Sequence, residues 1–252
     1  MKEKIIKLIH TKLFHVCVIT VIIVALLFIL GMIILKYNVE GETNMPFKLN
    51  KIVIISSSEG IDQENPDTKW DFIVNQNNDI YLYIEKNNNY SKTEIIDSVI
   101  LDNFNFEKQS QLGQINIYKP DSVDPNRIFK TNDENKVEKI EYIGDTNSNI
   151  KNLKMSNQGD VISFRVSNNN LNEYKSNEEE IINHNELLKK INLTNDDLKI
   201  NAKFDITIKL KSGKEFKSTI KLDMPVGDVI QDGTTSKEIT DLTNLIFKRV
   251  KN

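Results

Sequence analysis

Three short patterns place serine and lysine at spacings that could support nucleophilic catalysis. A serine lies three residues before a lysine in Ser148-Asn149-Ile150-Lys151, and Ser167-Asn168-Asn169 and Lys211-Ser212-Gly213 follow in chain order. In this chemistry a lysine amine removes the proton of the serine hydroxyl, so both side chains must share one face near the start of a helix. The question is therefore whether the chain around Ser148 can form such a helix.

The order of these patterns resembles the S-x-x-K, S-x-N and K-[ST]-G set of the penicillin-binding acyl-transferases. Ser148 lies in a polar run with no helical apolar stripe behind it, and the set from Ser148 to Gly213 spans only 66 residues, which is too few for the helical half of that fold. A second match, Ser218 to Lys221, lies in a predicted strand, where positions i and i+3 point to opposite faces. We therefore expect no catalytic residue and no enzyme activity.

His184 is the only histidine beyond the N-terminal region, and several glutamates lie close to it (Glu178, Glu179, Glu180 and Glu186). A structural zinc site needs four ligands, usually cysteine or histidine, and the chain after Cys17 has no cysteine. The sequence favours a solvated acidic face beside a helix.

Asp121, Asp124 and Asn126 could suggest a calcium loop. The EF-hand pattern needs a glycine at position six and a glutamate at position twelve, where this chain has Asn126 and Asn132. Turn formation explains these residues, so we expect no metal site and no cofactor.

One segment near the N-terminus is long and apolar enough to cross a membrane. Residues Phe14 to Leu35 include no charged side chain, and 22 helical residues span roughly 33 Å against a hydrocarbon core of about 30 Å. A signal peptide would have a shorter apolar run and a small-residue cleavage site. We expect an uncleaved helix that contacts the lipid bilayer through Phe14–Leu35.

The charges on either side of this helix predict its orientation. Residues 1–13 hold four lysines and one glutamate, whereas Lys36, Glu40 and Glu42 follow the helix. The positive-inside rule places such a basic tail in the cytoplasm. Residues 36–45 then form a short stalk, and residues 46–252 lie outside the cytoplasm at the cell membrane.

Charge and cysteine content narrow the function of the exported part. The net charge of −3 combines +3 in residues 1–35 with −6 in residues 36–252, so the exported part is a poor candidate for binding nucleic acid. The single cysteine, Cys17, lies inside the apolar helix, so the exported part has no disulfide and depends on its own core.

Alternation of apolar and polar residues predicts a mainly β fold. The expected strands are Phe47–Ser57, Trp70–Asn75, Ile80–Lys86, Glu94–Glu107, Gln114–Tyr118, Val137–Ile143, Val161–Ser167, Leu198–Leu210, Phe216–Met224 and Leu245–Val250. Residues Asn75–Asp79 are expected to be a turn. Glu94–Glu107 has apolar residues at both odd and even positions, which is typical of a central strand that is covered on both faces. One short helix is expected, capped by Asn183 or Asn185.

These elements predict an antiparallel β-sandwich, with an immunoglobulin-like arrangement as one form of it. The polar stretch 119–136 is the best internal boundary. The sequence is compatible with a single sandwich and with two sub-domains divided at this stretch.

The hairpin around Lys211-Ser212-Gly213 allows a prediction of register. A two-residue turn would place Leu210 opposite Glu215 and put the two apolar sets on opposite sides of the sheet. A three-residue loop, with glycine in the left-handed conformation at its third position, pairs Ile208 with Phe216. The same register pairs Lys209 with Glu215 on the wet face.

Several segments are similar to an uncharacterised group of single-pass membrane proteins from Clostridia-type Firmicutes. They are Lys69–Phe72, Asn77–Tyr81, Gln114–Pro120, Asn183–Lys190 and Gly233–Leu242. The resemblance implies a bacterial origin and an anchored topology, and it implies no functional residue.

We therefore expect a membrane-anchored, non-catalytic interaction or scaffold module of the bacterial cell envelope, with another envelope protein as its partner. The alternative is an extracytoplasmic enzyme or ligand-sensing domain whose site is formed by loops that the sequence does not bring together.

Overall fold

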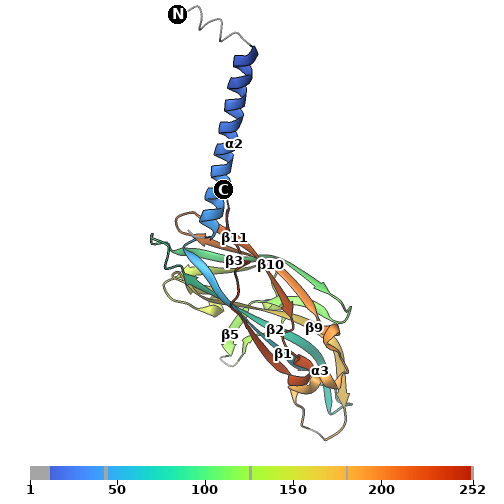
Figure 1. Cartoon of the computed structure of the whole chain (residues 1–252). Coiled ribbons are helices and arrows are strands. Elements are labelled where there is room, and N and C mark those ends of the chain that lie inside the picture. The colour runs from blue at the N-terminus through green and yellow to red at the C-terminus, as the bar shows by residue number, and fades with distance from the viewer. Residues whose placement is uncertain (1–11, 43–44, 125–126, 180, 251–252) are drawn as a thin grey trace, which may run out of the picture.

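The computed structural model describes residues 12–42, 45–124, 127–179 and 181–250. The first eleven residues, which include most of the predicted cytoplasmic tail, lie outside the described residues. A long N-terminal helix leads into a β-rich body made of two large sheets (Figure 1). The mainly β fold predicted from the sequence is confirmed.

The N-terminal helix α2 covers Lys12–Glu42. Its stretch His15–Ile33 has a mean hydropathy of 3.3, and it is the one described helix long and apolar enough to cross a membrane. The helix continues through most of the predicted stalk. Its apolar side chains are open to the surroundings, with Val21 68% and Phe28 66% exposed.

One sheet has the strand order β12-β1-β2-β9-β4 and the other β13-β11-β10-β3-β7-β8. All pairings in these sheets are antiparallel except that of β7 with β8. The strands of the first sheet are β1 (Phe47–Asp62), β2 (Trp70–Lys86), β4 (Gln114–Tyr118), β9 (Asp160–Ser176) and β12 (Thr234–Ile239). Those of the second are β3 (Ile96–Lys108), β7 (Ile140–Asp145), β8 (Lys154–Ser156), β10 (Ile200–Leu210), β11 (Glu215–Met224) and β13 (Lys248–Val250).

The predicted boundary at 119–136 contains a small hairpin, β5 (Pro120–Asp124) with β6 (Arg127–Phe129), and the 3-10 helix η1 (Asp133–Asn135). It connects β4 of one sheet to β7 of the other. Core residues come from both sides of this stretch, including Ile80 before it and Phe204 after it.

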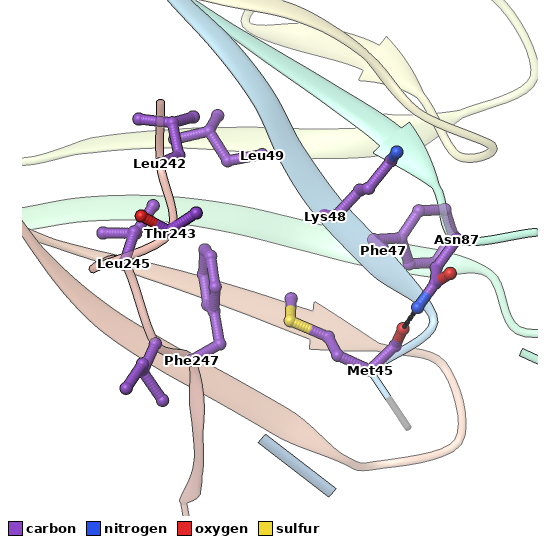
Figure 2. Close-up of a pocket in the computed structure, with 10 residues that line it drawn as sticks. Met45, Phe47, Lys48, Leu49, Asn87, Leu242, Thr243, Leu245 and Phe247 are labelled. Atoms are coloured by element: carbon purple, nitrogen blue, oxygen red, sulfur yellow. Dashed lines mark hydrogen bonds between the residues drawn. The ribbon is translucent and has the colours of Figure 1, made fainter. Parts of the chain in front are cut away.

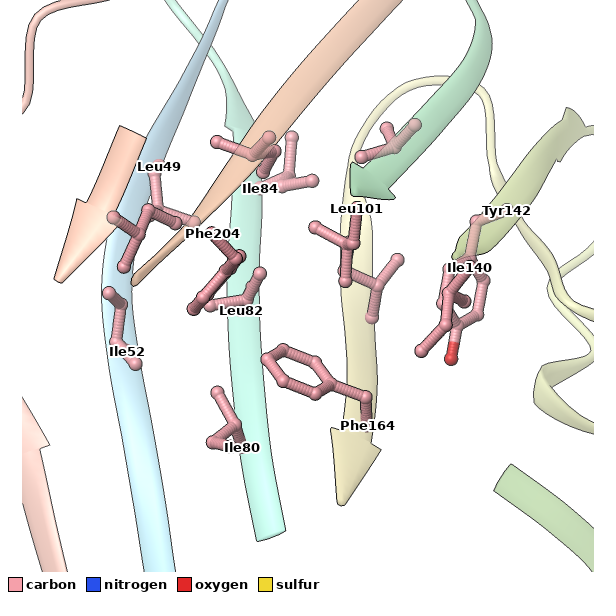
Figure 3. Close-up of a cluster of buried hydrophobic side chains, with 14 of the residues drawn as sticks. Leu49, Ile52, Ile80, Leu82, Ile84, Leu101, Ile140, Tyr142, Phe164 and Phe204 are labelled. Carbon is pink, nitrogen blue, oxygen red and sulfur yellow. The ribbon is translucent and has the colours of Figure 1, made fainter. Parts of the chain in front are cut away.

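The two sheets pack face to face over one large apolar core. Figure 3 shows Ile80, Leu82 and Phe164 of the first sheet near Leu101 and Phe204 of the second. The rings of Phe164 and Phe204 meet edge to face, with centroids 5.1 Å apart. Each fully buried side chain of this size contributes about 1.5–3 kcal/mol relative to exposure.

A second, smaller core lies at one end of β1, β2 and β9, where short helices cover the sheet. These are η3 (His184–Glu186), α3 (Leu187–Lys190), α4 (Asn195–Leu198) and α5 (Val229–Asp232). The predicted helix is confirmed, with Asn183 accepting a hydrogen bond at its start and Leu187 and Leu188 fully buried. Leu198, predicted to begin a strand, is instead in α4 and fills this second core.

The turn predicted at Asn75–Asp79 is wrong. Residues Trp70–Lys86 form one continuous strand, and Asn75 to Asn78 are at most 1% exposed. On the inner face Ser56 Oγ and Gln76 Nε2 both donate hydrogen bonds to Asn78 Oδ1, at 2.7 and 2.9 Å. These polar side chains separate the two apolar cores, which is why the strand is polar in its middle.

The prediction that β3 is apolar on both faces holds for Ile100, which is buried outside the main core, but the other apolar residues of the strand share one face. The pairing of β3 with β10 shifts twice, and each shift gives β3 one extra residue, near Asp97 and near Asn103. Such bulges change the parity of the strand. Ile96, Val99 and Phe104 therefore all reach the same core despite their mixed parity.

The predicted register of the β10–β11 hairpin is confirmed. Ile208 pairs with Phe216, and Lys209 pairs with Glu215 at an ion-pair distance of 3.3 Å. Gly213 has a φ of +80° and donates its backbone N–H to the carbonyl of Leu210.

Candidate functional site

The three serine and lysine patterns lie on three different elements. Ser148 is exposed just before the 3-10 helix η2 (Ile150–Asn152), and Lys211 is exposed at the tip of the β10–β11 hairpin. Ser167 is fully buried in β9, where its hydroxyl donates to Asn77 Oδ1 at 2.6 Å and also bonds to Asn169. Ser167 thus belongs to a structural hydrogen-bond network.

Among the described residues, no group of three or more histidine, cysteine, aspartate or glutamate side chains is placed to hold a metal ion. Asp121 forms an ion pair with Lys130 at 3.3 Å. Asn126 and Glu180, which the sequence placed near candidate ligand sets, lie outside the described residues.

The outer face of the first sheet carries a buried polar network that crosses its four neighbouring strands. Because Ile80 and Phe164 point into the core, the residues of opposite parity in β2 and β9 point outward. Asn77 donates to Glu59 Oε2 at 2.8 Å and accepts from Ser167. Asn169 continues the chain by donating to the hydroxyl of Tyr118 in β4.

Arg165 is the charged centre of this face. Its guanidinium donates two hydrogen bonds to Asp79, at 2.6 and 3.0 Å, and lies 3.6 Å from Glu59. The side chain is 12% exposed and lies over the ring of Phe129, 5.2 Å from its centroid. Burial opposes ionisation of Arg165, but the hydrogen bonds that it donates to Asp79, together with the negative charge of that carboxylate, outweigh burial and raise the pKa of the arginine. The network therefore contains a fixed positive charge between two carboxylates.

A cleft of about 200 Å³ opens at the edge of this network. Its lining residues are Ser57, Ser58, Glu59, Asn77, Phe129, Arg165 and His184. His184 is held there by its Nδ1, which accepts a hydrogen bond from the Gly60 N–H at 3.1 Å, and by Phe72, whose ring meets the imidazole edge to face. Because Nδ1 accepts this bond, the proton of a neutral imidazole lies on Nε2.

Sequence reasoning missed this site. Glu59, Asp79 and Arg165 are far apart in the chain and have no spacing that marks them as a group. The one feature of the sequence that could have indicated this network is the polar run Asn75–Asp79, and the same residue types are also common in turns. Only the pairing of β2 with β9 brings Asp79 opposite Arg165.

A second hollow lies at the end of the sandwich next to the anchor helix, where Met45 begins the β body. It has a volume of about 450 Å³ and is lined mainly by apolar side chains of β1 and of the C-terminal segment (Figure 2). Met45, Phe47 and Phe247 are each at most 4% exposed. Asn87 donates to the Met45 carbonyl at 2.9 Å and fixes the start of β1.

Comparisons of the chain with protein families, curated proteins and solved structures gave no match. The resemblance to single-pass proteins of Clostridia-type Firmicutes stays a prediction.

Proposed function

We propose that this chain is a single-pass membrane protein whose β-sandwich is a non-catalytic interaction module on the outer side of a bacterial cell membrane. The observation that carries the proposal is the uncovered apolar surface of α2. Over His15–Ile33 none of the helix is buried by the β body, so lipid is the natural cover for it.

The orientation rests on charge. Residues 1–13 carry a net charge of +3, and Glu40 and Glu42 follow the span, so the positive-inside rule leaves the sandwich outside the cytoplasm. The body lacks disulfides because Cys17, the one cysteine, lies in α2.

The cleft beside Arg165 is the recognition site that we favour for the partner, which we expect to be another envelope protein. Glu59, Asn77 and Arg165 lie on paired strands and are held by bidentate and buried hydrogen bonds, so they are fixed before a partner arrives. Glu59, His184 and Asn77 line this small concavity with a carboxylate, an imidazole and an amide. Such a set suits a polar side chain or a main-chain segment of a protein.

Cysteine labelling tests the anchored topology. In a Cys17→Ser background, Ser148→Cys places one thiol at an exposed position of the sandwich. A membrane-impermeant maleimide should label it in intact cells stripped of their wall. Labelling that requires lysis would contradict the proposed orientation, and the Cys17→Ser chain alone serves as the unlabelled control.

Photo-crosslinking tests the interaction role against the alternative of an enzyme or ligand sensor. A photoreactive amino acid at Ser57, in the cleft, should give a discrete protein adduct in cells, and the same residue at the exposed Asn147 should not. Glu59→Gln should weaken the Ser57 adduct. Absence of any adduct specific to position 57 would count against a protein partner at this cleft.

A further inference from the structure

The strand β12 leaves one edge of the first sheet open. At the other end of that sheet, β4 is covered by main-chain hydrogen bonds with residues 135–137. In the second sheet, Lys154 of the end strand β8 exchanges two main-chain bonds with Asn149, and the three-residue strand β13 contacts α2. Among the described residues, no strand pairs with β12 on the side away from β1. An open edge is a template for a further strand.

The ladder between β12 and β1 shows which main-chain groups point to the open edge. All six residues of β12 pair with β1 without a register shift. The N–H of Ser58 donates to the carbonyl of Gly233 at 3.2 Å, which makes these two residues a hydrogen-bonded pair. In an antiparallel ladder such pairs alternate, and the residues between them direct their N–H and C=O groups away from the partner strand. The outward residues are therefore Thr234, Ser236 and Glu238.

This edge is accessible and regular. Thr234, Ser236 and Glu238 are all exposed, and β12 contains neither proline nor a bulge, two features that commonly blunt an edge. Lys237 is exposed between them, and it forms no ion pair with any described residue. Opposite charges that face each other across a strand pair are stabilising, so an acidic residue is favoured opposite Lys237 on an added strand.

A second copy of this chain in the same membrane does not suit antiparallel pairing at this edge. The strand β1 begins beside the lower end of α2 and runs towards the end of the sandwich that carries α3, and β12 runs back towards the anchor (Figure 1). Antiparallel pairing of two β12 strands would turn the second copy end for end. Its anchor helix would then point away from the membrane that holds the first copy. A segment of a different chain has no such restriction.

We propose that an extended segment of the protein partner adds to the five-stranded first sheet as a sixth strand, beside β12. Its main chain bonds to Ser236 and Glu238, and an acidic side chain of the segment faces Lys237. The open edge continues into the cleft beside Arg165, because Thr234 pairs with Ser57, which lines that cleft. The inference rests on the proposed interaction role, and it adds that the partner binds through an acidic segment in β conformation.

The first test is photo-crosslinking of the full chain in cells, with a photoreactive amino acid at Glu238. Ser236→Pro removes an N–H that points to the added strand, so it should lower the adduct yield by at least about fivefold, the weight of one main-chain hydrogen bond. Ser236→Ala keeps that N–H and should keep the yield. Proline is tolerated in an edge strand where its nitrogen faces solvent, so the two variants should unfold at similar temperatures.

A second pair of variants tests the charge without a change in main-chain bonding. Lys237→Glu reverses the charge opposite the acidic residue of the partner and should also lower the adduct yield from Glu238. Lys237→Arg keeps the charge and should keep the yield.

The second test identifies the added strand. Mass spectrometry locates the crosslinked residue of the partner, and a synthetic peptide covers roughly ten residues around it, the upper length of a common strand. When this peptide is added to the full chain in lipid nanodiscs, the amides of Ser236 and Glu238 should exchange with deuterium more slowly. The Ser236→Pro chain should show no such protection at Glu238.

Equal adduct yields from Ser236→Pro and Ser236→Ala, an adduct with the mass of two copies of this chain, or unchanged amide exchange would overturn strand addition. Crosslinking from Ser57 separates this failure from failure of the interaction role. If Ser57 gives its adduct while the tests at β12 fail, only strand addition is wrong. If neither Ser57 nor Glu238 gives an adduct, both proposals are wrong.

Discussion

The hydroxyl of Ser167 donates a hydrogen bond to Oδ1 of Asn77 at 2.6 Å, although 90 residues separate them in the chain. Both side chains are at most 1% exposed, and Asn77 in turn donates to Glu59. This bond joins β9 to β2 on the face opposite the main core. It links the buried network to the cleft, because Asn77 and Glu59 both line that cleft.

Asn77→Ala should therefore destabilise the fold. The change leaves the Ser167 hydroxyl and a Glu59 oxygen without this partner in a buried setting, which costs about 1–3 kcal/mol in the free energy of unfolding. Chemical denaturation of the full chain in detergent, followed by the fluorescence of Trp70, the single tryptophan, measures it. Asn201→Ala, at an exposed position of β10, is the control and should change stability by less than about 0.5 kcal/mol.

Much of the fold was predictable from alternation where one face of a strand is wet and the other is buried. In β10 and β11 the even-numbered residues are apolar over most of both strands, and the parity of the loop then allows one register. The same rule failed in β2, because its inner face changes from Ile80 to Asn78 where the main core ends. In the sequence alone, a run of polar residues within a strand resembles a turn, because the neighbouring strand that forms hydrogen bonds with it is not known.

The predictions for other elements were wrong or missing for related reasons. The bulges of β3 change parity within one strand, and the exposed edge strand β12 has no apolar alternation to reveal it. The candidate cleft depends on Asp79 facing Arg165 across a strand pair and on η3 delivering His184, and neither contact leaves a local pattern.

Removing the charge of Arg165 should cost more than removing a surface charge. In Arg165→Met, the carboxylates of Asp79 and Glu59, each about 16% exposed, keep their charge without the cation between them. Breaking a largely buried pair in this way typically costs about 3–5 kcal/mol. The double variant Arg165→Met/Asp79→Asn should regain part of the loss. Equal unfolding free energies for wild type and Arg165→Met would contradict the structural role of this pair.

Acid should weaken the fold partly through Asp205. Partial burial opposes ionisation of this carboxyl, but bonds from Asn103, Thr219 and Lys217 outweigh it and lower its pKa to about 2, from an ordinary value of 3.8. A lowered pKa in the folded state stabilises the protein above pH 4, and this contribution is lost as the pH falls towards 2. Asp205→Asn should be less stable than wild type at pH 7, and the difference should shrink between pH 4 and pH 2. A difference that stays constant over this range would contradict the assignment.

Gly213→Val should be costly although the position is fully on the surface. Gly213 has a φ of +80°, and a Cβ built there meets no heavy atom within 4 Å, so the cost comes from backbone conformation alone. A β-branched residue resists positive φ, and strain of this kind is of order 1–3 kcal/mol. Lys211→Val, at the first position of the same loop, keeps the glycine and should cost much less. Gly213→Asn should lie between them, because asparagine tolerates the left-handed conformation. Thermal unfolding of the three variants should therefore rank valine at 213 lowest, and an unchanged melting temperature for Gly213→Val would show that the loop does not need the left-handed residue.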